Sequence, residues 1–238
     1  MRARRRSVRL VRMDPRAPLR EPSNRSFPFS FVSDSSRPSS HPDFWNVRYE
    51  RDEPLFGAEP NAFVEDQAHR LPPESEVVEL GAGEGRTPAW LARKHGHHTT
   101  AVDFSTTALA TAQERATAEN LSLEPVQADV RAWQPDRRWD AAIVTFLQLR
   151  PHERSRLYRL LKTIVRPGGW IFAEWFRPAH LSGDYDRMGP SRRDRMVPAD
   201  EVRRAFADER HSCVEAADVH LHEGPHLRGA AAVVRAIV

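Results

Sequence analysis

Cysteine is almost absent from this sequence, whose 238 residues include only Cys213. A single cysteine cannot form an internal disulfide or a cysteine-rich zinc site, which excludes disulfide-stabilised secreted folds and zinc fingers. This usage is typical of a reducing compartment, so we expect a cytoplasmic protein.

Long apolar runs and lysine are also scarce. No stretch approaches the roughly 20 apolar residues that a membrane-spanning helix needs, so we expect a soluble protein with no membrane partner. Lysine occurs only at Lys94 and Lys162. The net charge of +3 comes from a basic excess in residues 1–12. Acids and bases nearly balance elsewhere, so no nucleic-acid partner is expected.

The composition changes near residue 40. Residues 1–40 are rich in Arg, Ser and Pro and poor in apolar residues, which predicts a disordered basic tail. Residues 41–238 alternate short apolar runs with amphipathic stretches and are expected to form one domain.

The expected strands lie at 76–80, 99–103, 123–129, 140–146 and 170–175, with helices at about 86–95, 105–119 and 153–164. This alternation predicts an α/β fold with a doubly wound, Rossmann-like sheet that is mostly parallel. Residues 213–224 and 229–238 are too close for a helical crossover, so they should form a C-terminal antiparallel hairpin.

A glycine-rich loop, with Gly81, Gly83 and Gly85, directly follows the first expected strand. Ligands of doubly wound sheets bind at the carboxyl ends of the strands, where glycines let the backbone approach a ligand closely. A tight turn without a ligand is the alternative interpretation.

Two acidic residues follow the next two strands. Asp103 ends the second strand, where a carboxylate can accept both hydroxyls of a ribose. Asp129 and the N–H of Val130 follow the third strand, where an acceptor beside a donor suits an adenine edge. Either aspartate could instead cap a following turn or helix.

The glycine spacing distinguishes two kinds of ligand. A nicotinamide dinucleotide fingerprint requires glycine at position 86, where this chain has Arg86. A nicotinamide oxidoreductase is therefore disfavoured. An adenosine without phosphate fits better, and we expect S-adenosylmethionine.

Several segments resemble the ordered motifs of class I S-adenosylmethionine-dependent methyltransferases: "VVELGAGEGRTPAWLA", "AVDFS", "QADVRAW" and "RPGGWIFAEWF". The segments "FWNVRYE", "FGAEPNAFV" and "HLHEGPHLRG" are more specifically similar to the bacterial tellurite-resistance (TehB-like) and thiol methyltransferase group. The resemblance covers about residues 43–238. It implies a seven-stranded sheet, methyl transfer, and an N-terminal segment with Trp45, Arg48 and Tyr49 that closes over the cofactor.

The motifs and the strand ends together predict the cofactor-binding residues. These are Trp45, Arg48, Glu79, Gly81, Ala82, Gly83, Gly85, Asp103, Phe104, Ser105, Asp129, Val130, Thr145 and Phe146. Ser105 is also expected to cap the helix that follows it.

The acceptor is expected to be a small molecule, with a thiol or a tellurite-like oxyanion favoured. A soft nucleophile needs no obligatory base, because a thiol is partly ionised at neutral pH and nearby cations increase that fraction. The candidate catalytic residues are His152, His180 and Arg48. The arginine-rich segment 177–196, with Arg187, Arg192, Arg193 and Arg195, is expected to influence acceptor choice, or else to be a solvated loop.

Other functions remain open from the sequence alone. A small-molecule O-methyltransferase would need a base such as His152 or a metal. No metal site is expected, although His220, His222 and His226 lie near Glu223. Residues 145–148 lack the motif of amino-directed nucleic-acid methylases. A catalytically silent S-adenosylmethionine-binding regulator is a further possibility, and the chain is expected to be a monomer or homodimer.

Overall fold

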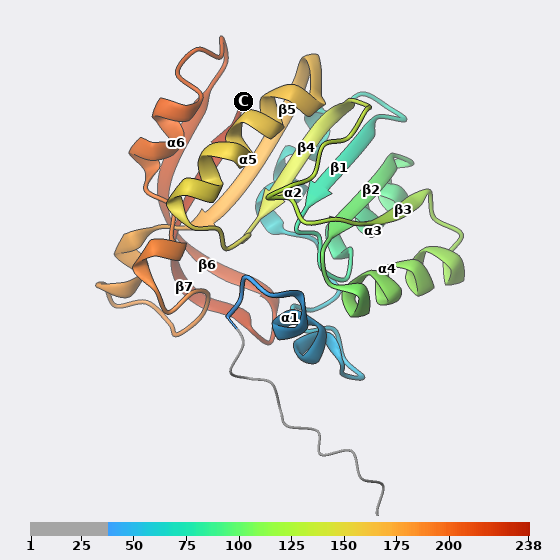
Figure 1. Cartoon of the computed structure of the whole chain (residues 1–238), viewed down its shortest axis with the longest axis horizontal. Helices are drawn as coiled ribbons and strands as arrows, with labels where there is room; N and C mark the ends of the chain where they lie inside the picture. Colours follow the sequence, from blue (N-terminus) through green and yellow to red (C-terminus); the bar gives the residue numbers. More distant parts are fainter. Residues whose placement is uncertain (1–37) are drawn as a thin grey trace, which may run out of the picture. The chain divides into compact units, whose positions relative to one another are not determined.

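A computed structural model describes residues 38–238 of the chain (Figure 1). The prediction of a disordered tail over residues 1–40 falls almost entirely outside the described residues. Within them, no helix is long and apolar enough to cross a membrane.

One seven-stranded sheet forms the centre of the domain, with the strand order β3-β2-β1-β4-β5-β7-β6. The five strands from β3 to β5 run parallel, β7 is antiparallel to β5, and β6 is antiparallel to β7. The bounds are β1 Glu76–Leu80, β2 His98–Asp103, β3 Leu123–Gln127, β4 Trp139–Thr145, β5 Val165–Phe176, β6 Cys213–Gly224 and β7 Leu227–Ile237. The predicted doubly wound sheet with a C-terminal hairpin is confirmed.

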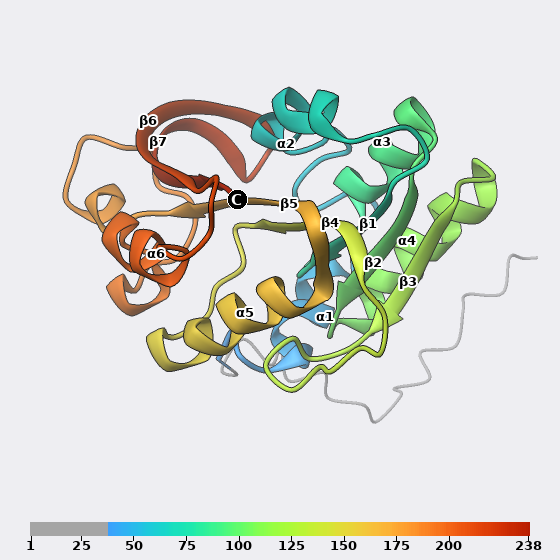
Figure 2. The same ribbon diagram turned by 90° about the horizontal axis from the view of Figure 1, so that it is seen from above.

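Helices cover both faces of the sheet (Figure 2). Helices α2, α3 and α4 pack on one face and α5 and α6 on the other. Their bounds are α1 Pro42–Tyr49, α2 Ala62–Gln67, α3 Arg86–His95, α4 Thr106–Ala118, α5 Pro151–Ile164 and α6 Ala199–Ala205, with short 3-10 turns η1 Ala68–Arg70, η2 Pro178–Leu181 and η3 Arg193–Arg195.

Burial explains why the central strands read as nearly continuous apolar runs. Val77 and Val78 are neighbours on β1 that point to opposite faces, and both are buried, as expected for a parallel sheet covered on both sides. On β5, Phe172 and Trp175 are buried in the same way. The core therefore lies in two layers, and its rigid strands fix the loops at their carboxyl ends.

Several strand boundaries differ from the sequence prediction, and two of these differences have a clear cause. β3 ends at Gln127 and not at 129, because Asp129 begins a turn in which its carbonyl accepts from the N–H groups of Ala132 and Trp133. β5 starts at Val165 and not at 170, because Val165 pairs with Trp139 across an irregularity in the register.

Candidate active site

A cavity lies at the carboxyl ends of the parallel strands, beneath the N-terminal segment and the loop after β4. Including solvent at its mouth, it holds about 1160 Å³. Its lining contains most of the predicted cofactor residues: Trp45, Glu79, Gly81, Ala82, Gly83, Asp103, Phe104, Asp129, Val130, Thr145 and Phe146. The structure therefore brings together residues from every segment that the sequence singled out.

The glycine loop between β1 and α3 forms the floor of the cavity. Gly81 and Gly83 have φ values of +75° and +54°, in the left-handed region that side chains disfavour. A Cβ at Gly83 would lie 2.6 Å from the hydroxyl oxygen of Tyr49, and one at Gly81 would lie 2.8 Å from Leu147 Cδ1. Both glycines are thus required by conformation and by space.

Glu79 contributes a buried carboxylate to the cavity wall, near the end of β1. It accepts a hydrogen bond from the Thr145 hydroxyl at 2.7 Å, a neutral partner. Burial raises the pKa of Glu79 to about 7. A positively charged ligand group beside it would favour the ionised carboxylate.

Asp103, at the end of β2, ties the glycine loop to the neighbouring strand. Its two carboxylate oxygens accept from the N–H groups of Gly83 and Ser105, each at 2.9 Å. Burial raises the pKa of Asp103. Each carboxylate oxygen can accept more than one hydrogen bond, so Asp103 retains acceptor capacity for ligand hydroxyls.

Two predicted cofactor residues support the cavity without lining it. Gly85 is the N-cap of α3 and adopts a φ of +67°. Ser105 is the N-cap of α4, and its side chain accepts from the N–H of Ala108 at 3.2 Å. The predicted cap at Ser105 is confirmed, whereas direct cofactor contact by these two residues stays a prediction.

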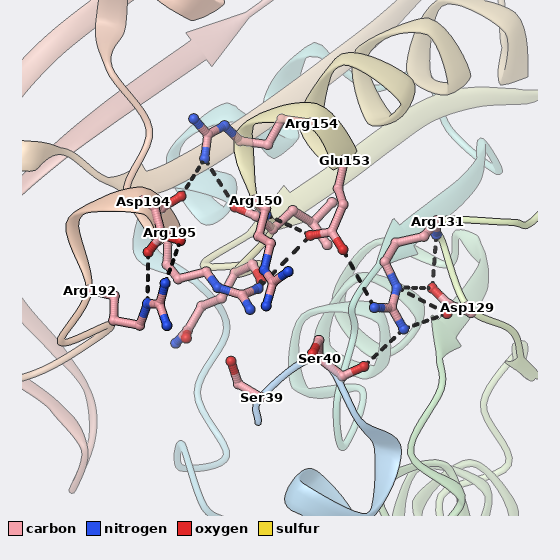
Figure 3. Close-up of polar contacts among 12 residues, drawn as sticks. Ser39, Ser40, Asp129, Arg131, Arg150, Glu153, Arg154, Arg192, Asp194 and Arg195 are labelled. Atoms are coloured by element: carbon pink, nitrogen blue, oxygen red, sulfur yellow. Dashed lines mark hydrogen bonds and ion pairs between the residues drawn. The ribbon is translucent and has the colours of Figure 1, made fainter. Parts of the chain in front are cut away.

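Asp129 is held by Arg131 in a two-pronged ion pair, with nitrogen–oxygen distances of 2.6–3.0 Å (Figure 3). Burial opposes ionisation of Asp129, but the hydrogen bonds from Arg131 outweigh it and lower its pKa. Arg131 also donates to the backbone carbonyl of Ser40. The sequence did not reveal this partner, and the role of Asp129 at an adenine edge stays a prediction.

The N-terminal segment covers the cavity with three aromatic rings. Trp45, Tyr49 and Phe56 lie with ring centroids 6.0–6.4 Å apart, and all three line the cavity. Tyr49 and Trp45 come from α1, while Phe56 follows it in the loop. This placement suits a segment that closes over a ligand, but closure itself stays a prediction.

Arg48 departs from its predicted place. Its guanidinium carbon lies 3.6 Å from the centroid of the Phe44 ring, and it donates to the Phe44 carbonyl at 3.4 Å. It does not line the cavity. Arg48 follows Phe44 by four residues on α1, so its side chain can lie over the Phe44 ring.

The two predicted catalytic histidines also lie outside the cavity lining. His180 is buried, with Nε2 bonded to the Met188 carbonyl at 3.0 Å and Nδ1 accepting from the N–H of Ala232 at 3.3 Å. Burial lowers its pKa, so the ring is a neutral structural link. His152 is exposed on the first turn of α5. The structure therefore gives neither histidine a catalytic position.

Glu223 belongs to a buried polar network and not to a histidine cluster. It receives hydrogen bonds from Arg86 at 2.5 Å and Asn61 at 3.0 Å. Among residues 38–238, no group of three or more His, Cys, Asp or Glu side chains is arranged to hold a metal.

The part of the cavity near β4, β5 and β7 contains residues to which, apart from Arg195, the sequence analysis gave no individual role. They are Leu147, Gln148, Leu149, Glu153, Phe176, Gly189, Arg195 and Leu227. Phe146, beside them, has a φ of +54°, which is uncommon for a bulky residue and often marks a functional site. Among these residues, only Arg195 was indicated by the sequence, because it belongs to the arginine-rich segment 177–196.

Comparisons with known proteins agree with this geometry. Residues 77–169 match the family model of a methyltransferase domain. The chain is 27% identical over 173 residues to the ubiquinone biosynthesis O-methyltransferase of Paraburkholderia phytofirmans, covering 70% of this chain and 73% of the relative.

Two solved structures share the fold. TehB from Haemophilus influenzae superposes with a TM-score of 0.59 and 19% identity, over 74% of this chain and 61% of the TehB chain. The chain thus spans about three fifths of TehB. A structure that concerns conversion of a disulfide bond into a thioacetal group during echinomycin biosynthesis gives a TM-score of 0.60 and 20% identity, over 83% and 92% of the two chains.

A methyltransferase domain therefore occupies the part of the chain that carries the glycine loop and both acidic strand ends. The matched domain and the fold together support a methyltransferase. Its cofactor is S-adenosylmethionine.

Proposed function

We propose that this enzyme methylates a small-molecule acceptor through a thiol or a comparable chalcogen anion. The cavity has two chemically different halves, which follow the strand order. The half over β1, β2 and β3 carries the glycine loop and buried carboxylates, and the half over β4, β5 and β7 is mainly apolar.

The first half fits the cofactor. Gly81 and Gly83 leave room against the backbone, Asp103 can accept ribose hydroxyls, and the buried carboxylate of Glu79 suits a cationic group. When bound, S-adenosylmethionine supplies an electrophilic methyl group on a sulfonium. The protein's own task is then to orient an acceptor and exclude water.

The second half carries the acceptor proposal. Phe146, Leu147, Phe176 and Leu227 form apolar walls, and no histidine, lysine or cysteine lines the cavity within residues 38–238. A thiol requires no protein base, because a fraction is already thiolate at neutral pH. The guanidinium of Arg195, which also lines this half, would increase that fraction.

The relatives support two different acceptor atoms. The structural similarity to TehB and to the structure connected with thioacetal formation supports sulfur or a tellurite-like acceptor. The similarity to a ubiquinone biosynthesis O-methyltransferase supports a hydroxyl as a second candidate. In that case Glu153, which lines the cavity with a side chain 12% exposed, would be the candidate base.

Release of S-adenosylhomocysteine, measured across thiols, selenite, tellurite, phenols and catechols, tests the proposal. We expect thiols or the chalcogen oxyanions to give the highest kcat/KM. Turnover confined to phenols or catechols would refute the sulfur proposal and leave the hydroxyl candidate. Failure of the protein to bind S-adenosylhomocysteine would contradict the assignment of the cavity itself.

Gly83→Ala tests the cofactor half separately. The added Cβ meets the Tyr49 hydroxyl, so we expect affinity for S-adenosylhomocysteine to fall at least tenfold by calorimetry. Gly96→Ala is the matched control, because Gly96 also has a positive φ of +69° but open space around its Cβ. If the clash is the cause, Gly83→Ala should cost less affinity in a Tyr49→Phe background than in the wild type.

The cytoplasmic location and the monomeric or homodimeric state stay predictions from the sequence. Size-exclusion chromatography with light scattering would determine the oligomeric state.

A further inference from the structure

Arg195 is a buried cation whose hydrogen-bonding capacity is only partly used. The residue is 5% exposed and lies at the end of η3, in the acceptor half of the cavity lining. Its Nη1 donates to the Gln148 carbonyl at 2.9 Å. Its Nε is buried and has no hydrogen-bond partner among residues 38–238. An unpaired donor on a buried charge is costly, which suggests that a ligand completes its contacts.

The neighbouring charges do not neutralise Arg195. Three nearby arginines have carboxylates of their own. Arg131 pairs with Asp129 and Arg192 with Asp194 (Figure 3). Arg154 pairs with Glu201. The remaining carboxylate, Glu153, lies 3.9 Å from Arg195 and 3.5 Å from Arg131. It also accepts from the backbone N–H of Arg150 at 2.7 Å.

Arg150 adds a second positive charge beside Arg195. Its Nε is also buried without a hydrogen-bond partner in the described part of the chain. Burial is the main reason why the pKa of Arg195 is lowered, and the positive charge of Arg150 lowers it further. Glu153 is shared by the guanidinium groups of Arg195 and Arg131, and no carboxylate in residues 38–238 forms an ion pair with Arg150. A positive charge is therefore left uncompensated at the N-terminal end of α5, where the helix dipole also favours an anion.

We propose that Arg195, supported by Arg150, binds an anionic group on the methyl acceptor, a carboxylate or a comparable oxyanion. This inference rests on the proposed function, since it assigns the β4–β5–β7 half of the cavity to the acceptor. Arg195 is then a specificity residue. A planar guanidinium suits a carboxylate because its N–H groups can donate two parallel hydrogen bonds.

Matched acceptor pairs test the proposal. Each pair has the same nucleophile with and without a carboxylate: 4-mercaptobenzoate and thiophenol, 3-mercaptopropionate and propane-1-thiol, and 4-hydroxybenzoate and phenol. In the wild type we expect kcat/KM to favour the anionic member by about 10- to 100-fold, the range of a hydrogen-bonded charge pair. Arg195→Gln should lower kcat/KM for the anionic members more than for the neutral members, mainly through KM, and so abolish this preference.

Two further variants separate recognition from folding. Arg195→Lys keeps the charge but loses the planar donor pair, so it should retain part of the preference. Arg192→Gln removes an exposed arginine of the same segment that is paired with Asp194, and should keep the wild-type preference. Thermal unfolding of each variant would show whether lost activity reflects lost structure.

Calorimetry distinguishes failure of this proposal from failure of the proposed function. We expect Arg195→Gln to bind S-adenosylhomocysteine with wild-type affinity. Weaker binding, equal to the loss in turnover, would mean that Arg195 holds the cofactor's own carboxylate and would overturn the proposal. If no acceptor turns over, the affinities of 4-mercaptobenzoate and thiophenol for the S-adenosylhomocysteine complex test the proposal instead. We expect 4-mercaptobenzoate to bind more tightly, and equal affinities would overturn the proposal.

Discussion

At the residue scale, the catalytic region is defined by a few buried ionisable groups. Glu79, Asp103 and Arg195 all lie at the cavity with little solvent exposure, so each depends strongly on its partners. Sequence position predicted the first two, because strand ends in a doubly wound sheet are identifiable from apolar runs. Arg195 lies in an irregular segment, whose path depends on tertiary contacts, so its proximity to Gln148 could not be predicted.

Glu79 should make cofactor binding depend on pH. Its pKa is about 7 in the free protein, and a bound cationic group would stabilise the ionised carboxylate. Affinity for S-adenosylhomocysteine should therefore weaken roughly tenfold between pH 7.5 and pH 6. Glu79→Gln should reduce this dependence, as measured by calorimetry, and an unchanged slope in the variant would refute the assignment.

The same residue should affect the stability of the ligand-free protein with the opposite sign. Because the folded-state pKa is raised from 4.5 to about 7, Glu79 contributes most below pH 4.5, and its contribution is lost as the pH rises through 7. Relative to Glu79→Gln, the wild type should lose about 3 kcal/mol of free energy of unfolding as the pH rises over this range. Urea denaturation at several pH values would measure it.

At the scale of elements, the regular helices and strands were predictable and the cover of the cavity was not. The glycine loop and the Ser105 cap carry local signals, so the expected starts at 86 and 105 agree closely with α3 and α4. Helix α1 carries only a weak periodic signal, and resemblance alone suggested that Arg48 contacts the cofactor, whereas its side chain lies over Phe44 outside the cavity lining. Its position depends on contacts with distant residues such as Ser105.

Ser105 connects two elements, so its replacement should affect both. Its hydroxyl caps α4 and donates to the Asn46 side chain of α1 at 2.7 Å. We expect Ser105→Ala to lower the free energy of unfolding by about 1–2 kcal/mol and to weaken S-adenosylhomocysteine binding, because α1 covers the cavity. Thr106→Ala, at the neighbouring exposed position, is the control and should change both quantities by much less.

At the scale of the whole molecule, a buried polar network joins segments that are far apart in the sequence. Asn61, the N-cap of α2, donates to Glu174 on β5 and Glu223 on β6, and Arg235 on β7 pairs with Glu174 at 2.7 Å. The sequence analysis placed Glu223 near a possible metal cluster and gave Glu174 no role. Such long-range partners cannot be inferred from local spacing.

Removing one member of this network should destabilise the entire domain. Glu174 is fully buried, so Arg235→Met leaves a carboxylate without its cation and should cost about 3 kcal/mol in the free energy of unfolding. Adding Glu174→Gln should recover part of the loss. Arg203→Met, which removes an exposed pair with Asp200, should cost less than about 1 kcal/mol. Equal losses in the two single variants would contradict this account.

Arg86 determines how easily this scaffold could change its ligand. The residue stands where a dinucleotide enzyme has its third glycine, and its side chain reaches away from the loop to the carbonyl of Glu59 and the carboxylate of Glu223. Arg86→Gly would open space for a pyrophosphate, but it would leave the buried carboxylate of Glu223 without its cation. A change to nicotinamide binding would therefore need replacements both in α3, at Arg86, and in the β6–β7 hairpin, at Glu223. The Arg86 replacement alone would destabilise the fold.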